Sequence, residues 1–202
     1  MRGFFYSISI FICSSTLAQS NSISKHHLGV KTSINISSMI GSALKNPTPK
    51  YGYTAGSFCV FHSEKKITAY TEIVGNFKGS NFNNGDLGYS KIALFYVDAS
   101  VLPMVKLKNK NAIAAGPSLS YLGLSSIYVG AKKKSEIDKL NLKPWDLNLT
   151  VFYHIKKDIV TFQFGTKIGL IDIYNNLNLT TITPSIDQGN IHTISFEIGM
   201  LF

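Results

Sequence analysis

The sequence predicts an all-β fold: an eight-stranded antiparallel up-and-down transmembrane β-barrel that follows a cleaved signal peptide. Three observations predict it. Apolar and polar residues alternate with a period of two in eight segments. The connections between these segments are alternately short and long, and the chain closes on an apolar strand that ends in an aromatic residue. At 202 residues the chain is long enough for one such domain, expected over residues 19–202.

Residues 1–18 predict a secretory signal peptide. Met1 and Arg2 give a positive start, residues 3–12 are apolar, and residues 16–18 (TLA) form a small-x-small cleavage site. We expect cleavage after Ala18 or Gln19. An amino-terminal membrane helix is the weaker alternative, because the apolar run is shorter than the roughly 20 residues that a span requires.

The composition favours a lipid-facing β protein over a nucleic-acid-binding one. Only 15% of the residues are charged and 45% are hydrophobic, while the net charge of +9 comes from scattered lysines. Nucleic-acid binding favours clustered basic residues, so no nucleic acid is expected as a partner. We expect the lysines in turns and loops, where they face water and the anionic head groups of outer-membrane lipid and lipopolysaccharide. A specific protein partner stays unknown.

Motifs for cofactors, metals and catalysis are not found. The sequence has no Gly-rich phosphate loop, paired-cysteine motif, His-Glu-x-x-His or Gly-x-Ser-x-Gly. His26 and His27 are adjacent, and neighbours on a strand point to opposite faces, so a shared metal is not expected. After signal removal Cys59 is the only cysteine, which excludes an internal disulfide and predicts a buried or lipid-facing filler. We therefore expect no cofactor and no metal.

Alternation is clearest in the last three segments, residues 144–155, 159–172 and 190–202. In the final segment the even-numbered residues from Ile194 to Phe202 are apolar, whereas the odd-numbered residues from Thr193 to Gly199 are polar or small. Four earlier segments alternate less cleanly, at residues 28–37, 67–78, 89–107 and 111–124. Residues 51–62 form an eighth strand whose orientation stays unassigned, because its aromatic and small residues fall on both faces.

The connections alternate in length along the chain. Residues 63–66, 108–110 and 156–158 are short, and residues 38–50, 79–88, 125–143 and 175–189 are long and rich in turn-forming residues. In an antiparallel barrel this places all short turns and both termini at one end, an asymmetry found in outer-membrane barrels. Aromatic residues are expected as a girdle near the long-loop ends: Tyr51, Tyr53, Phe77, Phe82, Tyr89, Tyr121, Trp145 and Tyr174. Phe61 and Phe202 would mark the other interface.

Four motifs in fixed order resemble the PorT-like outer-membrane β-barrel family. They are residues 69–74 (AYTEIV) followed by Lys78 and Gly79, residues 96–103 (YVDASVLP), residues 115–121 (AGPSLSY) and the closing residues 196–202. The chain departs from the family pattern in the fourth strand, where a Glu-Ile-Pro-like step is replaced by Asp98 with a later Pro103, and at Lys167, where arginine is common. The resemblance implies a barrel in a membrane, and it implies no single activity.

The last strand is similar to the assembly signal of outer-membrane barrels. Phe196, Ile198, Met200 and Phe202 share one face, and the chain stops at the aromatic Phe202. We therefore expect the barrel-assembly machinery to be a partner. The alternative is an ordinary edge strand that happens to end in an aromatic residue.

Five charged residues are predicted to face the lumen: Lys31, Glu72, Asp98, Lys167 and Glu197. The interior of an eight-stranded barrel has room only for side chains, so we expect a buried polar network that pairs these charges. Glu197 is expected to be the nearest carboxylate of both Lys31 and Lys167. A proton path or narrow pore is the alternative.

The predicted function is that of a small bacterial outer-membrane barrel with a structural or interaction role, a polar-filled lumen and no evident catalytic activity. A lipid-modifying enzyme is one alternative, for which the inward His154 is the residue to watch. A soluble lipocalin-like ligand binder is the other. The orientation of the apolar face separates the soluble ligand binder from the two membrane classes, because a membrane barrel is apolar outside and a soluble barrel is apolar inside.

Overall fold

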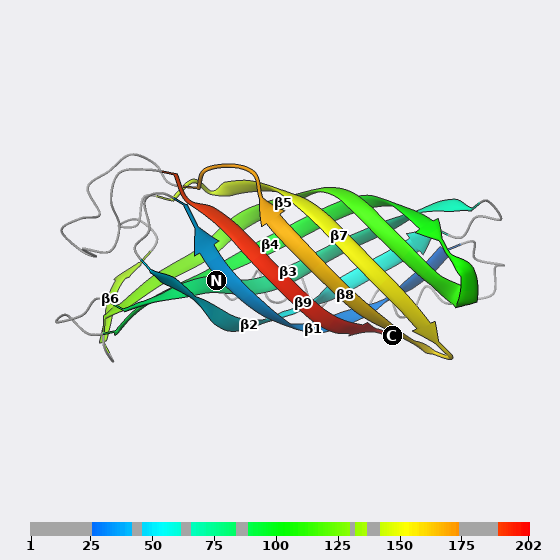
Figure 1. Ribbon diagram of the computed structural model, residues 1–202, viewed down its shortest axis with the longest axis horizontal. Helices are drawn as coiled ribbons and strands as arrows, with labels where there is room; N and C mark the ends of the chain where they lie inside the picture. The colour runs from blue at the N-terminus through cyan, green and yellow to red at the C-terminus, as the bar shows by residue number, and fades with distance from the viewer. Residues whose placement is uncertain are drawn as a thin grey trace, which may run out of the picture.

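The computed structural model describes residues 26–41, 46–61, 66–83, 89–129, 132–136, 142–173 and 190–202. Eight long strands form a tilted, closed antiparallel barrel (Figure 1). They are β1 (His26–Ile40), β2 (Pro47–Phe61), β3 (Ile67–Asn83), β4 (Tyr89–Lys106), β5 (Asn111–Val129), β7 (Trp145–Lys157), β8 (Val160–Gly169) and β9 (His192–Leu201). The predicted signal peptide and the connection 175–189 lie outside the described residues.

The barrel closes between its first and last strands. β1 pairs with β9 in an antiparallel register that sets Ile34 opposite Ile198. Beyond the end of β9, Phe202 accepts a hydrogen bond from Val30 N at 3.1 Å and donates one to Val30 O at 2.9 Å. All other pairings between the eight barrel strands join successive ones. The predicted eight-stranded up-and-down barrel is thus confirmed, and none of the described residues forms a helix long and apolar enough to span a membrane.

A short additional strand, β6 (Lys132–Glu136), extends the sheet at one end of the molecule (Figure 1). Among the described strands it pairs only with β5, through Ser126 to Val129. The barrel part of β5 pairs with β4 and β7. β6 therefore prolongs the β5 edge beyond the barrel and adds no ninth strand to the wall.

Several strands run further than the sequence predicts. Parts of the expected long connections are strand, namely residues 38–40 and 47–50 of the connection 38–50 and residues 79–83 of the connection 79–88, while residues 42–45 and 84–88 lie outside the described residues. Expecting loops there was wrong. Glycine, asparagine and serine have low strand propensity, but its free-energy cost is small. The backbone hydrogen bonds to an adjacent strand stabilise the strand by more than this cost.

The short turns gather at the opposite end. A 3-10 turn (Lys108–Lys110) joins β4 to β5, and the β7–β8 turn contains Asp158. Asn109, Lys110 and Asp158 have positive φ angles of 59°, 62° and 54°, which tight turns between antiparallel strands require. The carboxyl terminus lies at this same end (Figure 1).

The outer surface of the barrel is apolar and the lumen is polar at its centre. Ile34, Ile73 and Val101 are 69%, 60% and 69% exposed, whereas the alternate residues Lys31 and Glu72 are buried. An outward apolar band is what contact with lipid hydrocarbon requires. This orientation rules out the soluble lipocalin-like alternative, which needs the apolar face inside.

The orientation of β2, which the sequence leaves open, is set by its place in the sheet. Tyr51 and Tyr53 point outward and Thr54 and Phe58 point inward. Cys59 lies on the outward face and is half-buried, with no disulfide partner among the described residues. Aromatic residues on both faces made the parity of this strand ambiguous from sequence alone.

Much of the predicted aromatic girdle lies where expected. Tyr51, Tyr53, Tyr121 and Trp145 are exposed on the outer surface toward the long-loop end, and Phe61 and Phe202 are exposed toward the other end. Phe77 is half-buried beside Tyr53, with ring centroids 4.5 Å apart. The side chain of Tyr89 and all of Tyr174 lie outside the described residues.

Phe82 is a correction to that girdle, because it is buried inside the barrel. β3 continues past its expected end. Because Phe82 and Glu72 are an even number of residues apart on this strand, both side chains lie on the inward face. Its ring belongs to the interior packing and not to the lipid interface.

Candidate functional site in the barrel lumen

A continuous chain of ion pairs crosses the middle of the lumen. Lysines and carboxylates alternate along it in the order Glu197, Lys31, Glu72, Lys167, Asp98 and Lys78. Lys31 Nζ lies 2.8 Å from Glu72 Oε2 and 2.5 Å from Glu197 Oε1. Lys167 Nζ lies 2.9 Å from Glu72 Oε1 and 3.0 Å from Asp98 Oδ2. With three positive and three negative groups, the chain is electrically balanced.

The structure brings all five predicted lumen residues together, but one predicted pairing is wrong. Glu197 contacts Lys31 and does not pair with Lys167, which takes its carboxylates from Glu72 on β3 and Asp98 on β4. The sequence indicates only which charged residues lie on neighbouring strands, so the predicted pairs were limited to those. In a barrel this narrow, a lysine side chain reaches across the lumen to strands on the opposite wall.

Lys78 is a member of the network that the prediction missed. Its Nζ lies 3.7 Å from Asp98 Oδ2, and the side chain is fully buried. Lys78 shares the parity of Glu72, which was the available signal, but it is the last residue of the strand that the sequence predicts and was not included in the network. The continuation of β3 holds it in the barrel wall.

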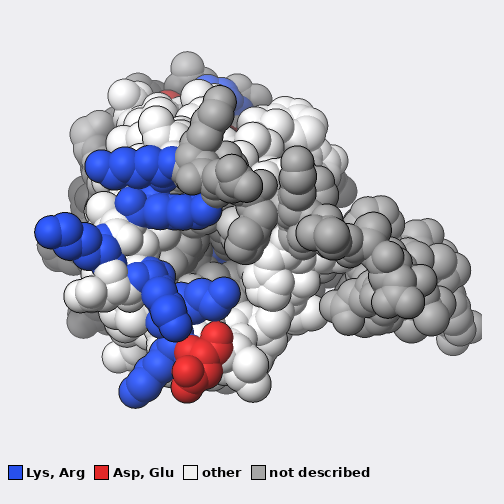
Figure 2. All heavy atoms as spheres, turned by 90° about the vertical axis from the view of Figure 1, so that its right-hand side faces the viewer, with Lys and Arg blue, Asp and Glu red and all other residues white. Residues whose placement is uncertain are grey.

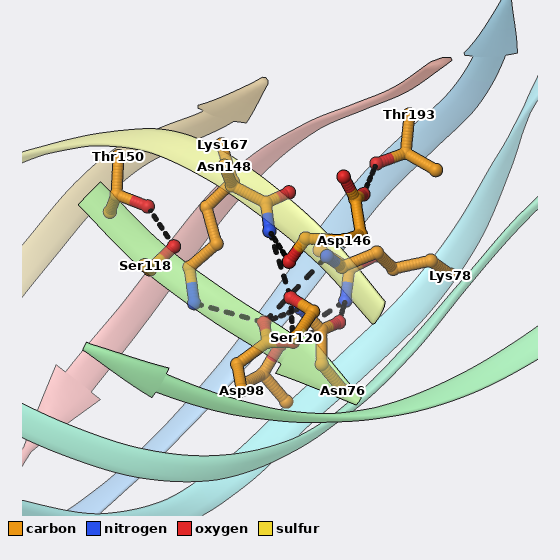
Figure 3. A network of polar contacts seen from close by, with 12 residues as sticks. Asn76, Lys78, Asp98, Ser118, Ser120, Asp146, Asn148, Thr150, Lys167 and Thr193 are labelled. Atoms are coloured by element: carbon orange, nitrogen blue, oxygen red, sulfur yellow. Dashed lines mark hydrogen bonds and ion pairs between the residues drawn. The ribbon is translucent and has the colours of Figure 1, made fainter. Parts of the chain in front are cut away.

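Neutral side chains donate hydrogen bonds to the carboxylates of Asp98 and Asp146 (Figure 3). Asp98 accepts a hydrogen bond from Asn76 Nδ2 at 2.9 Å and another from Ser120 Oγ at 2.6 Å. Asn148 Nδ2 donates to Ser120 Oγ at 2.9 Å, and Thr193 Oγ1 donates to Asp146 at 3.0 Å. Buried charges are tolerated when hydrogen bonds of this kind offset the loss of water.

Aromatic rings border the charged layer on both sides. Lys31 Nζ lies 4.4 Å from the centroid of the Phe152 ring, and Lys78 Nζ lies 5.0 Å from that of Tyr96. Tyr70 Oη donates a hydrogen bond to Glu72 at 2.8 Å. Gly165 makes room for Phe152, because a Cβ atom at that position would lie 2.2 Å from the ring. The cations are thereby held by ring faces as well as by carboxylates.

Two apolar clusters fill the lumen above and below the charged layer. The cluster toward the long-loop end contains Met39, Phe82, Ile92, Leu94, Tyr96, Leu122, Ile173 and Ile191. The cluster toward the short-turn end contains Phe58, Tyr70, Leu102, Met104, Ala112, Ala114, Phe152 and Leu201. The polar-filled lumen that the sequence predicts is confirmed only for the central layer. The lumen is instead layered, and a hydrated ion would have to cross apolar packing at both ends.

The short-turn mouth contains a cavity of about 260 Å³. Its walls include the apolar Phe58, Tyr70, Met104 and Leu201, and its polar lining includes His154 and three lysines, Lys106, Lys110 and Lys156. Lysines dominate this end of the molecule (Figure 2). The mouth therefore combines an apolar interior with a positively charged rim.

His154 lies in this mouth, where its ring centroid is 5.0 Å from that of Tyr70. The side chain is only 5% exposed, and its Nε2 atom has no hydrogen-bond partner among the described residues. The same residues contain no group of three or more His, Cys, Asp or Glu side chains placed to hold a metal ion.

The apolar outer band, the polar lumen centre and the short turns at one end define a transmembrane β-barrel of the outer-membrane type. Residues 17–175 match the family model of the outer membrane protein beta-barrel domain, and the chain belongs to this family and to the outer membrane. The match ends before β9, so the closing strand is placed by the structure alone.

A solved structure shares the fold. The crystal structure of neisserial surface protein A superposes with a TM-score of 0.53 at 10% identity, covering 87% of this chain and 97% of that one. Ail, the attachment invasion locus protein of Yersinia pestis, gives a TM-score of 0.48 at 8% identity, covering 89% and 98%. Comparison with curated proteins found no match.

Proposed function

We propose that this outer-membrane barrel has a structural or interaction role, exercised at its surfaces and not through its lumen. The observation that carries the proposal is the layered filling of the lumen, in which paired buried charges lie between two apolar clusters. Such a filling stabilises the wall and leaves the two ends as the places where protein partners bind.

The long-loop end supplies a binding platform of strand extensions, formed by β3, β4, β5 and β6 (Figure 1). Lys91 Nζ lies 5.4 Å from the centroid of the Tyr128 ring on this platform. In outer-membrane barrels the long-loop end faces the exterior, where lipopolysaccharide presents anionic groups. Lysines here would bind those groups, and the platform itself would bind a protein partner.

The finer assignments are part of the same proposal. The order of motifs supports a PorT-like barrel, and residues 1–18 support export through a signal peptide that is cleaved after Ala18 or Gln19. The outward row of Phe196, Ile198, Met200 and Phe202 supports recognition by the barrel-assembly machinery.

Site-specific photo-cross-linking in cells tests the interaction role. A photoreactive amino acid would replace Tyr128 on the platform, Lys66 at the short-turn end, or Ile73 in the lipid-facing band. We expect discrete protein adducts from position 128 or from position 66. Position 73 is the control, because Ile73 also lies on the outer surface but contacts lipid, and we expect no protein adduct from it.

The opposite result would favour the lipid-modifying enzyme. No protein adduct from either end, together with an acyl-chain profile of membrane lipids that changes when the protein is deleted, would contradict the interaction role. Mass spectrometry of extracted lipids from the two strains supplies that second measurement.

A further inference from the structure

We propose that the cavity at the short-turn mouth binds an amphiphile with a single short acyl chain and an anionic head group. This site is separate from the platform at the other end, so it goes beyond the proposed interaction role. Short turns of outer-membrane barrels face the periplasm, which makes this a periplasmic binding site.

The inner part of the cavity matches an acyl chain. Phe58, Tyr70, Met104 and Leu201 line it, and all four belong to the buried apolar cluster at this end. The volume of about 260 Å³ lies just below the roughly 300–1,000 Å³ of pockets that hold drug-sized ligands. A single short chain fits this space, whereas a lipid with two long chains does not.

The rim selects the charge of the head group. Lys106, Lys110 and Lys156 line the cavity from three places on the chain, namely the end of β4, the following turn and β7. No Asp or Glu lines it. A cavity with cationic groups at its mouth and no carboxylate concentrates anions and repels cations.

A buried polar group inside the cavity points to a ligand independently of the lysines. His154 lines the cavity, is 95% buried, and has an Nε2 atom with no partner among the residues that the structure describes. Buried polar groups in folded proteins are normally hydrogen-bonded, so a bound head group that supplies a partner explains the unpaired Nε2 atom of His154.

Methionine-methyl NMR provides a sharp test, because the described methionines report on three different places. Met104 lines the cavity, Met39 lies in the opposite apolar cluster, and Met200 is 39% exposed on the lipid-facing surface. The protein would be labelled with ¹³C-methyl methionine, purified from outer membranes and placed in phosphatidylcholine nanodiscs. Octanoate would then be titrated. Acetate is the control probe that lacks the long chain, and octyltrimethylammonium is the control probe that keeps the chain but carries a positive charge.

We expect octanoate to shift the Met104 signal saturably while the Met39 signal stays fixed, and we expect neither control probe to do so. Replacing Lys156 by Gln should weaken octanoate binding about fivefold, as expected for the loss of one exposed charge interaction. Lys157→Gln is the matched control, because Lys157 is the adjacent exposed lysine and does not line the cavity.

Several outcomes would overturn the proposal. An equal response to acetate would indicate a simple anion site, and an equal response to octyltrimethylammonium would indicate unselective apolar binding. Shifts confined to Met200 would indicate partition into the bilayer only. Ala112→Leu, which fills the cavity from its wall, should abolish the Met104 response in a barrel that still shows heat-modifiable migration on a gel; a retained response would place the ligand elsewhere.

Discussion

Glu72 is the centre of the charged layer, because its carboxylate pairs with both Lys31 on β1 and Lys167 on β8. It contacts Lys31 and Lys167 and accepts a hydrogen bond from Tyr70. Glu197, by contrast, contacts Lys31 alone among the lysines in the network. The two carboxylates therefore differ in how many buried charges they keep neutralised.

The first prediction follows from this difference. Glu72→Ala should destabilise the barrel by about 3–5 kcal/mol, since it removes one of the two carboxylates from both Lys31 and Lys167 and leaves a net positive charge in the buried network. Glu197→Ala should destabilise it less, because Lys31 keeps Glu72, and Lys157→Ala, which removes an exposed charge, should have little effect. The urea unfolding midpoint in lipid vesicles measures all three. A larger decrease in the unfolding midpoint for Glu197→Ala than for Glu72→Ala would contradict the central role of Glu72 in the charged layer.

A double-mutant cycle tests closure of the barrel at residue scale. Lys31 on β1 and Glu197 on β9 meet only because these two strands pair. The variant Lys31→Ala/Glu197→Ala should be less destabilised than the sum of its single changes, because residues in contact are non-additive. Additive free energies of unfolding would mean that the two side chains do not meet.

Gly165 gives a steric prediction in the same layer. Gly165→Ala would place a methyl group 2.2 Å from the Phe152 ring, so the ring must move away from Lys31. Overpacking of this kind typically costs about 1–3 kcal/mol. Gly75→Ala is the control, where the nearest ring atom lies at 3.1 Å and a small adjustment suffices. Equal unfolding midpoints for the two variants would show that Phe152 is not tightly held.

At the scale of elements, the end of the chain has two separable roles. The backbone of Phe202 exchanges two hydrogen bonds with Val30, so it helps to close the barrel. Its side chain is 52% exposed and contributes little to interior packing. Deleting the residue would remove both features, whereas Phe202→Ala removes only the aromatic ring.

Phe202→Ala should lower the amount of assembled barrel without changing synthesis, because the ring is proposed to belong to the assembly signal. Heat-modifiable protein in the outer-membrane fraction measures assembly, and total protein measures synthesis. Phe61→Ala is the matched control, an outward aromatic at the same end that is 40% exposed. An equal effect of both changes would assign the ring a general interfacial role and remove the argument for recognition.

At the scale of the whole molecule, the layered lumen predicts an electrically silent barrel. The wild-type protein in a planar lipid bilayer should give no resolved conductance steps. Phe152→Ala should also be silent, because the cluster around Phe82 and Tyr96 still fills the other end. Ohmic steps from the wild-type protein would contradict the sealed lumen and would restore the narrow-pore alternative.

The alternation of residues along each strand is a local property, and it could be interpreted without the structure. Parity placed Lys31, Glu72, Asp98, Lys167 and Glu197 on one face, and their charges indicated that this face is the interior. The apolar residues of the two interior clusters were not predicted in this way. Turn-rich segments located the connections but not the strand ends, since pairing with β4 extends β3 over residues 79–83, which include Phe82, despite their weak strand propensity.

The partners of each charge depend on distances across the lumen, which are set by strand tilt, stagger and side-chain length together. No periodicity along the chain contains that information. Lys167 therefore pairs with Asp98 and Glu72 from the far wall, in place of Glu197 on the adjacent strand. The cavity at the short-turn mouth arises in the same way, because Phe58, Met104, His154 and Leu201 from four strands meet only when the sheet closes.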